Sequence, residues 1–124
     1  MSIHQGEIYW IKINEHDSNE IVHPHVIIQD DLLNNSRIPT TVVCAISTNM
    51  KKAYQIGNVA LDENEGNLEK RSTVIVSQVS IIDKSCIGEY IGMLSPERVE
   101  EIFQGMKQQQ RLQEENIKKV DNAI

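Results

Sequence analysis

The sequence predicts a mainly β fold: one small, strongly curved antiparallel sheet or barrel, closed by a helix at the C-terminal end. Three observations support this fold class. The chain has 124 residues, a length typical of a single domain around one core. It contains 18 isoleucines and 10 valines against 6 leucines, and β-branched side chains favour strands. Near Leu94 the apolar pattern changes to the spacing of a helix.

Six segments have the alternation or the apolar run of a strand. They are residues 6–13, 26–29, 40–47, 58–61, 72–79 and 86–92. The segment 40–47 is apolar almost throughout, so we expect it to be central in the sheet. Pro24 cannot donate to a strand ladder, which places it at the start of the second strand or on an edge. Residues 80–84 either continue the fifth strand or turn a corner.

The segments between the strands are rich in turn formers. Residues 14–20 contain no aliphatic residue, and residues 31–39 combine asparagines with a proline. Residues 49–55 have the character of an exposed connection, and residues 62–69 are acidic and contain a glycine. We expect all four segments to be loops or turns.

The C-terminal helix begins with a recognisable cap. Ser95 is a good N-cap, Pro96 suits the first helical position, and Glu97 complements the positive end of the helix. The apolar residues that follow at i, i+3, i+4 and i+7 are Val99, Ile102, Phe103 and Met106. We expect residues 1–110 to form a single domain. Residues 111–124 are polar and charged, so we expect a helical extension or a mobile tail there.

Composition excludes several classes of protein. A net charge of −6 excludes a generally basic nucleic-acid binder, although it leaves room for a local basic patch. No apolar run approaches the roughly 18 residues of a membrane span, and no secretory signal is visible at the N-terminus. Cys44 and Cys86 lie in apolar surroundings, which favours buried free thiols in a reducing compartment. We therefore expect a cytoplasmic protein without a membrane anchor.

His23 and His25 are the most unusual local feature. In an extended chain, residues two apart point the same way, so both imidazoles would share one face. They could perform acid–base chemistry, because histidine titrates near neutral pH. They could bind a metal if a third ligand joined them, and His4, His16 and Asp30 are candidates without diagnostic spacing. They could also be ordinary strand residues, which local sequence favours.

Five further polar positions have both a functional and a plain structural interpretation. Ser47 and Asn49 follow the third predicted strand, where a hydroxyl positions a phosphate oxygen or simply caps a turn. Lys51 and Lys52 form an adjacent pair that meets phosphates or is only solvated. Gln78 lies between apolar strand residues, where it reads a base edge or pairs with a neighbouring backbone group.

Five segments, in this order along the chain, resemble the MazF/PemK/Kid family of toxins. They are residues 6–10 (Gly-Glu-Ile-Tyr-Trp), 23–31 (a proline followed by a hydrophobic strand closing Gln-Asp-Asp), 39–47 (Pro-Thr to Ile-Ser), 78–84 (a strand Gln followed by Ile-Asp-Lys) and 94–97 (Leu-Ser-Pro-Glu). The resemblance covers about residues 5–107. No single motif is specific, but the order of all five indicates the fold.

The resemblance implies an SH3-like fold of the MazF/CcdB type and a homodimer. It implies the toxin of a type II toxin–antitoxin system, an mRNA interferase that cleaves single-stranded RNA at short sequences. That reaction needs neither metal nor cofactor, because the 2′-hydroxyl attacks the adjacent phosphate and the 5′-oxygen leaves. The expected partners are single-stranded RNA, an antitoxin protein that covers the RNA groove, and a second copy of the chain.

The sequence departs from the family pattern at the catalytic positions. His23 stands where the family has an arginine before the proline, and Ser47 stands where it has a threonine. Ser77 replaces the acidic residue that often precedes Gln78, and Ser80 replaces an arginine two positions after it. We therefore expect His23 to act as acid or base, while the Ser47 hydroxyl donates to the phosphate.

The remaining expected contacts to RNA share a polar or charged side chain near these segments. They are Ser18, Glu20, His25, Asn49, Lys51, Lys52 and Gln78. The alternative function is a non-catalytic member of the same scaffold that binds a protein, either an antitoxin or a gyrase-like target. The loss of charged site residues and the net charge of −6 motivate this alternative.

Overall fold

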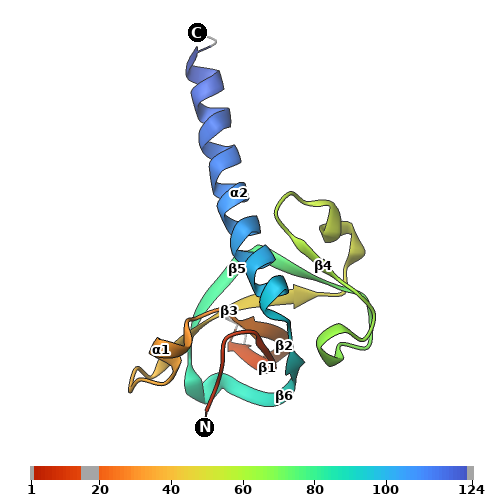
Figure 1. The fold of residues 1–124 in the computed structure, drawn as a ribbon, viewed down its shortest axis with the longest axis vertical. Helices are drawn as coiled ribbons and strands as arrows, with labels where there is room; N and C mark the ends of the chain where they lie inside the picture. Colours follow the sequence, from red (N-terminus) through yellow and green to blue (C-terminus); the bar gives the residue numbers. More distant parts are fainter. Residues whose placement is uncertain (1, 15–19, 123–124) are drawn as a thin grey trace.

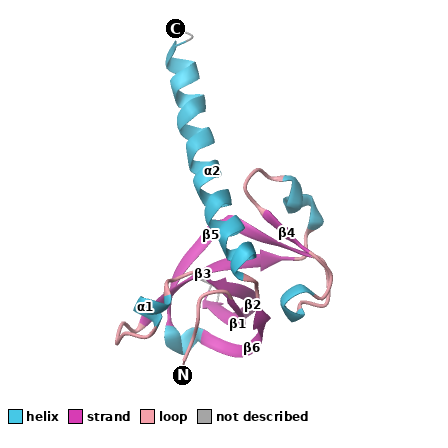
Figure 2. Ribbon diagram, viewed as in Figure 1, coloured by secondary structure: helices cyan, strands magenta, loops and turns pink. Residues whose placement is uncertain are grey.

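The computed structural model describes residues 2–14 and 20–122, with side chains for residues 2–13 and 22–111. Six strands in this part form one antiparallel sheet in the order β4-β5-β3-β2-β1-β6, and the long helix α2 leaves its edge (Figures 1 and 2). The strands are β1 (Glu7–Asn14), β2 (Glu20–Ile27), β3 (Thr40–Ser47), β4 (Val59–Leu61), β5 (Ser72–Asp83) and β6 (Ile87–Met93). The helices are α1 (Asp31–Asn34) and α2 (Pro96–Asn122), with the 3-10 turns η1 (Met50–Tyr54), η2 (Glu65–Asn67) and η3 (Lys84–Cys86). The predicted fold class is confirmed.

Apolar side chains pack on both faces of the curved sheet, because strand residues alternate between the faces. On one face, Ile8, Val26 and Cys44 belong to the cluster that α2 covers. On the other face, Tyr9, Ile11, Ile27 and Val43 belong to a second buried cluster. The predicted helical stripe is confirmed at its buried positions: the residues that pack toward the first cluster are Val99, Ile102, Phe103 and Met106.

The turn η2 links the two ends of the sheet, which do not pair with each other in the described strand order. Asn67 donates from its side-chain amide to the Ile91 carbonyl of β6, at 3.0 Å. Arg98 of α2 donates two hydrogen bonds to the Glu65 carboxylate of η2, at 2.7 and 3.0 Å. Strands β4 and β6 therefore share no ladder, and η2 connects this end of the sheet to β6 and to α2 instead.

The second strand differs from its prediction. It begins at Glu20 instead of Val26 and ends at Ile27, so Pro24 lies within it, opposite Trp10 of β1. The ladder between β2 and β3 starts only at His25. Pro24 thus lies where β2 has a partner on one side only, and the missing N–H leaves no gap in the ladder to β3.

Three smaller expectations were also resolved by the fold. Residues 31–39, expected as a loop, contain the short helix α1, whose N-cap Asp30 accepts from Leu32 N. Residues 80–83 continue β5 rather than turning a corner. Cys44 is buried as expected, whereas Cys86 is only half-buried, so the expectation of two buried thiols was wrong for Cys86.

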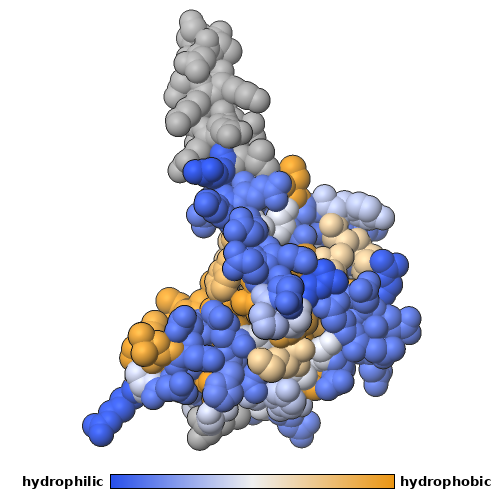
Figure 3. Space-filling view, viewed as in Figure 1, coloured by the Kyte–Doolittle hydropathy of each residue, from blue (hydrophilic) through white to orange (hydrophobic). Residues whose placement is uncertain are grey.

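The outer surface is uneven. The coloured part of α2, residues 96–111, is mostly hydrophilic in this view, while apolar residues gather over α1 (Figure 3). The exposed aliphatic residues of α1, of the segment after it and of β5 are Leu32, Leu33, Ile38, Val79 and Ile81. The part of the chain that is described contains no helix long and apolar enough to cross a membrane.

Candidate active site

A cavity of about 370 Å³ opens on the sheet face that carries the second apolar cluster, where β2, β3, β5 and η1 meet. Besides Thr48, the polar residues that line it are His23, His25, Ser47, Lys52 and Gln78. Sequence reasoning named all five as site residues. The structure brings them together from segments more than 50 residues apart.

Strand geometry explains why these residues meet. His25 lies opposite Ala45 in the β2–β3 ladder, so side chains two positions from each one share the same face. His23 and Ser47 are those neighbours. The interpretation that both imidazoles share one face is therefore confirmed by their common cavity.

The His25 ring has a defined tautomer. It is 1% exposed, and its Nδ1 lies 3.0 Å from the His23 carbonyl oxygen. A carbonyl oxygen only accepts, so Nδ1 carries the hydrogen and donates. Burial lowers the pKa of His25, an effect that outweighs the hydrogen bond to the His23 carbonyl, which raises it. The neutral ring then carries a lone pair on Nε2, for which the described residues offer no partner.

His23 lies one pleat further along β2 and is exposed. Its backbone pairs with Ile11 of β1, which fixes the side chain at the cavity wall. No hydrogen bond from its ring to another described residue is present, so both ring nitrogens can meet a ligand.

Ser47 and Asn49 have distinct roles at the end of β3. The Ser47 hydroxyl oxygen accepts from Asn49 N at 3.1 Å, so the turn interpretation is correct for its oxygen. The hydroxyl hydrogen is still available to donate into the cavity. The Asn49 side chain accepts from Lys51 N at 3.1 Å and caps η1, and Asn49 does not line the cavity.

The two adjacent lysines separate in the fold. Lys52 lines the cavity, whereas Lys51 is exposed outside it. Lys52 is held by Asn58, whose side chain donates to the Lys52 carbonyl at 3.0 Å and accepts from Val76 N at 3.1 Å. Asn58 is a positioning residue that sequence reasoning missed, since nothing around it in the sequence reveals an amide that bridges η1 and β5.

A bulge in β5 brings Ile75 and Gln78 to the cavity. Cys44 pairs with Val79 and Ile46 pairs with Val74, so two steps along β3 correspond to five along β5. The Cys44 thiol satisfies one backbone group of the bulge by donating to the Ile75 carbonyl at 3.1 Å. Burial raises the pKa of Cys44 to about 12, which keeps this thiol protonated as a donor.

The other expected contacts do not reach this cavity or lie outside the described part. Ser18 and His16 lie outside the described residues, and Glu20 begins β2 without a described side chain. His4 and Asp30, proposed as third metal ligands, lie near α1 instead of in the cavity. Within the described ranges, no group of three or more His, Cys, Asp or Glu side chains is placed to hold a metal ion.

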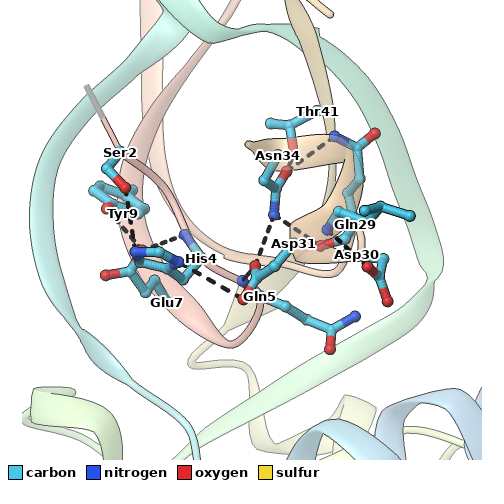
Figure 4. A network of polar contacts seen from close by, with 11 residues as sticks. Ser2, His4, Gln5, Glu7, Tyr9, Gln29, Asp30, Asp31, Asn34 and Thr41 are labelled. Atoms are coloured by element: carbon cyan, nitrogen blue, oxygen red, sulfur yellow. Dashed lines mark hydrogen bonds and ion pairs between the residues drawn. The ribbon is translucent and has the colours of Figure 1, made fainter. Parts of the chain in front are cut away.

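A polar network elsewhere fixes the N-terminal segment to α1 and β3 (Figure 4). Asp31 accepts from Gln5 N at 2.6 Å, and this bond is the main reason that the pKa of Asp31 is lowered. The buried Asn34 accepts from the Thr41 hydroxyl at 2.9 Å and donates to the Gln29 carbonyl at 2.8 Å. These contacts are structural, because they join backbone segments and leave the cavity untouched.

The fold and the cavity define a class of protein: a small curved sheet with a C-terminal helix, whose cavity gathers imidazole, hydroxyl, ammonium and amide groups. Within that class, the model of the family described as PemK-like, MazF-like toxin of type II toxin-antitoxin system matches residues 4–110. The chain belongs to this family, and the resemblance drawn from the five segments is confirmed.

Known proteins agree with this assignment. The chain is 27% identical over 109 residues to Endoribonuclease MazF2 of Mycobacterium bovis, covering 86% of this chain and 96% of that protein. A mycobacterial endoribonuclease solved in complex with its cognate antitoxin has a TM-score of 0.67 and 15% identity, covering 84% and 90% of the two chains. MazE-MazF from Deinococcus radiodurans has a TM-score of 0.69 and 13% identity, covering 86% and 94%. These structures share the fold of this chain.

Proposed function

We propose that this toxin-family chain is an endoribonuclease that cleaves single-stranded RNA without a metal or cofactor. The observation that carries the proposal is the meeting of His23 and Ser47 in one cavity. The relative from Mycobacterium bovis, which aligns with 86% of this chain, is named an endoribonuclease, and this supports the same activity here.

The proposed reaction is an attack of the 2′-oxygen on the adjacent phosphorus. A base takes the 2′-hydroxyl proton as the O–P bond forms, and an acid gives a proton to the 5′-oxygen as its bond to phosphorus breaks. The products are a 2′,3′-cyclic phosphate and a 5′-hydroxyl. The enzyme must therefore supply one proton acceptor, one proton donor and groups that stabilise the extra negative charge on the phosphate oxygens.

His23 supplies the proton transfer that arginine cannot perform near neutral pH, since a guanidinium keeps its proton. His25 is its natural partner, because its buried neutral ring carries a free lone pair on Nε2. Ser47 then donates its hydroxyl hydrogen to a phosphate oxygen. Lys52 adds positive charge, and Gln78, which is exposed at the rim, presents its amide to a base.

The test is incubation of the purified protein with mixed single-stranded RNA, with and without EDTA, followed by mapping of both cut ends. Cyclic phosphate ends in the presence of EDTA are expected. His23→Ala should lower the rate by about 10²–10⁴-fold, the usual contribution of a general acid or base. The matched control is His4→Ala, which removes an exposed histidine outside the cavity.

A second variant separates proton transfer from charge. His23→Arg restores the family's cation but removes the imidazole that can give and take a proton. Its cleavage rate should depend less on pH between about 5 and 8 than that of the wild-type protein. Cleavage that is unchanged in His23→Ala would overturn the assignment. Binding of an antitoxin without any RNA turnover would instead favour the non-catalytic alternative.

We also propose that the protein is a cytoplasmic homodimer neutralised by an antitoxin, as related toxins solved with their antitoxins suggest. Leu32 of α1 and Ile81 of β5 are exposed apolar residues, and Lys84, which follows β5, donates to the Asn34 carbonyl of α1 at 3.1 Å. Ile81→Asp should therefore give monomers in sedimentation experiments, while Ile56→Asp, at another exposed apolar site, should not.

The domain assignment is part of the same proposal. Residues 1–110 form the functional unit, and residues 111–124 are a polar extension beyond it. The family match ends at residue 110, and α2 continues to Asn122, well beyond the sheet (Figure 1). A chain ending at residue 110 should keep its melting temperature and its cleavage activity, and loss of either would contradict this division.

A further inference from the structure

Ser2, His4 and Asp31 form a cluster of polar side chains outside the candidate active site (Figure 4). The Ser2 hydroxyl lies 3.2 Å from Nε2 of His4, and Nδ1 of the same ring lies 3.6 Å from a carboxylate oxygen of Asp31. The imidazole is therefore placed between a hydroxyl and a carboxylate, each at a different ring nitrogen. We call these three residues the N-terminal triad.

The contacts of His4 favour one tautomer of its neutral ring. A carboxylate only accepts, so Nδ1, which faces Asp31, carries the ring hydrogen. Nε2 then keeps its lone pair and accepts from the Ser2 hydroxyl. In this arrangement an imidazole can take the proton of a nucleophilic hydroxyl while a carboxylate orients the ring. The distance from Nδ1 to Asp31 is longer than a hydrogen bond, which is common in an enzyme without its substrate.

The triad is held in place although it lies close to the N-terminus. Ile3, between Ser2 and His4, is 1% exposed and packs in the second apolar cluster. The His4 N–H donates to the Glu7 carboxylate, and the N–H of the next residue donates to Asp31 at 2.6 Å. The segment is therefore tied to the sheet and to α1, while the Ser2 and His4 side chains remain exposed to solvent.

We infer that the N-terminal triad transfers an acyl group from a small activated ester to the Ser2 oxygen. Nε2 of His4 takes the hydroxyl proton as the bond from Ser2 Oγ to the carbonyl carbon forms. It gives this proton to the leaving oxygen as the bond between that oxygen and the carbon breaks. The products are a free alcohol and an ester on Ser2. The Ile3 N–H has no hydrogen-bond partner among the described residues and is available to the developing oxyanion.

The test is incubation of the full chain with p-nitrophenyl acetate. The release of p-nitrophenol is followed by absorbance, and the modified residue is identified by mass spectrometry of peptides. An acetyl ester on Ser2 is expected. Neutral hydroxylamine removes an ester but leaves the acetyl amides that this reagent forms on lysines and on the terminal amine, so non-specific acetylation is recognised.

Variants at exposed positions then separate the roles of the nucleophile and the base. Ser2→Ala should abolish the hydroxylamine-sensitive ester, and His4→Ala should slow its formation by about 10²–10⁴-fold. The matched control is Ser36→Ala, because the exposed Ser36 hydroxyl donates to the Leu33 carbonyl and not to an imidazole. That variant should form the ester on Ser2 at the wild-type rate.

Asp31 is a positioning residue, because it acts through His4. Asp31→Asn keeps an oxygen that can accept from Gln5 N but removes the negative charge. The ester should form more slowly, and the midpoint of the pH–rate profile should move to lower pH, because the imidazolium loses a stabilising carboxylate. Glu7, the other carboxylate at His4, stays in place. A purely structural role of Asp31 would leave that midpoint unchanged.

The outcomes are independent of the proposed function, since the triad residues do not line the RNA cavity. RNA cleavage should therefore be the same in Ser2→Ala as in the wild-type protein. The absence of a hydroxylamine-sensitive ester on Ser2 in the wild-type protein would overturn the inference. Formation of that ester in His4→Ala at the wild-type rate would overturn it as well, because Ser2 would then react without its base.

Discussion

A contact between two glycines decides how α2 sits on the sheet, and it allows a sharp prediction for Gly105→Ala. Gly105 lies within α2, and a Cβ placed on it would lie 1.9 Å from the Gly57 carbonyl oxygen. Gly57 has φ +92°, a backbone conformation that L side chains rarely adopt. Helix propensity alone predicts that alanine at position 105 stabilises the protein by up to about 1 kcal/mol. The contact predicts the opposite sign.

The size of the effect follows from the required movement. An ordinary contact of a Cβ begins at 3.4 Å, so the two backbones must separate by about 1.5 Å. Ile102, three residues before Gly105, is fully buried in the cluster beneath α2, which resists that movement. Overpacking of this kind costs about 1–3 kcal/mol. The overlap is severe, so we take the upper part of that range, about 2–3 kcal/mol; subtracting the propensity gain of about 1 kcal/mol leaves a loss of about 1–2 kcal/mol, or a melting temperature lower by roughly 4–8 °C at about 4 °C per kcal/mol.

The assay is thermal and urea denaturation followed by circular dichroism. The matched control is Lys107→Ala, an exposed position on the same helix, where lysine and alanine differ little in helix propensity. A melting temperature of Gly105→Ala at or above that of the wild-type protein would refute the reasoning. The variant should also cleave RNA more slowly, because the segment around Gly57 continues from η1, which carries Lys52.

Three further predictions concern stability and reactivity. Burial lowers the pKa of His25 in the folded state, so protonation of this ring favours the unfolded chain. The free energy of unfolding is therefore unaffected by His25 above about pH 6.5 and falls as the pH drops below that value. His25→Gln should therefore show a flatter dependence of the urea midpoint on pH between about 5 and 7. Arg98→Ala removes both hydrogen bonds to Glu65 and should cost about 1–2 kcal/mol, because this pair is mostly covered. A thiol reagent should label Cys86 in the native protein and Cys44 only after unfolding, because Cys44 is buried with a pKa raised to about 12.

The sequence allowed the elements with a strong local signal to be predicted. Residues 40–47 were predicted as a strand with the bounds that β3 has, because an uninterrupted β-branched run has few alternatives. The start of α2 at Pro96 followed from its cap. The start of β2 was predicted too late, because residues 20–25 contain a glutamate, two histidines and a proline. Pairing with β1 makes them a strand, and local propensity does not reveal such pairing.

The candidate site shows the same boundary between local and long-range information. The alternation of strand residues placed His23 and His25 on one face, and the order of the family's segments brought Ser47 to them. The geometry of η1 decides that Lys52, and not Lys51, lines the cavity. Two identical neighbouring side chains in the sequence do not reveal that geometry. Asn58 acts only because the bulge in β5 leaves Val76 N without a strand partner, and a change of register is a property of two distant strands.

With an imidazole in place of the family's guanidinium, this cavity has fewer positive charges to stabilise a bound phosphate. Among the described residues that line it, Lys52 is the one permanent cation, while the buried His25 ring stays neutral near pH 7. Most of the stabilisation of the phosphate must then come from neutral donors such as the Ser47 hydroxyl, which are effective in a cavity that partly excludes water. Because the His25 ring is neutral, the cavity also avoids the cost of burying a second charge besides that of Lys52. We therefore propose that proton transfer by His23 and donation by Ser47 together take the place of the family's arginine, and both single variants should then lose activity.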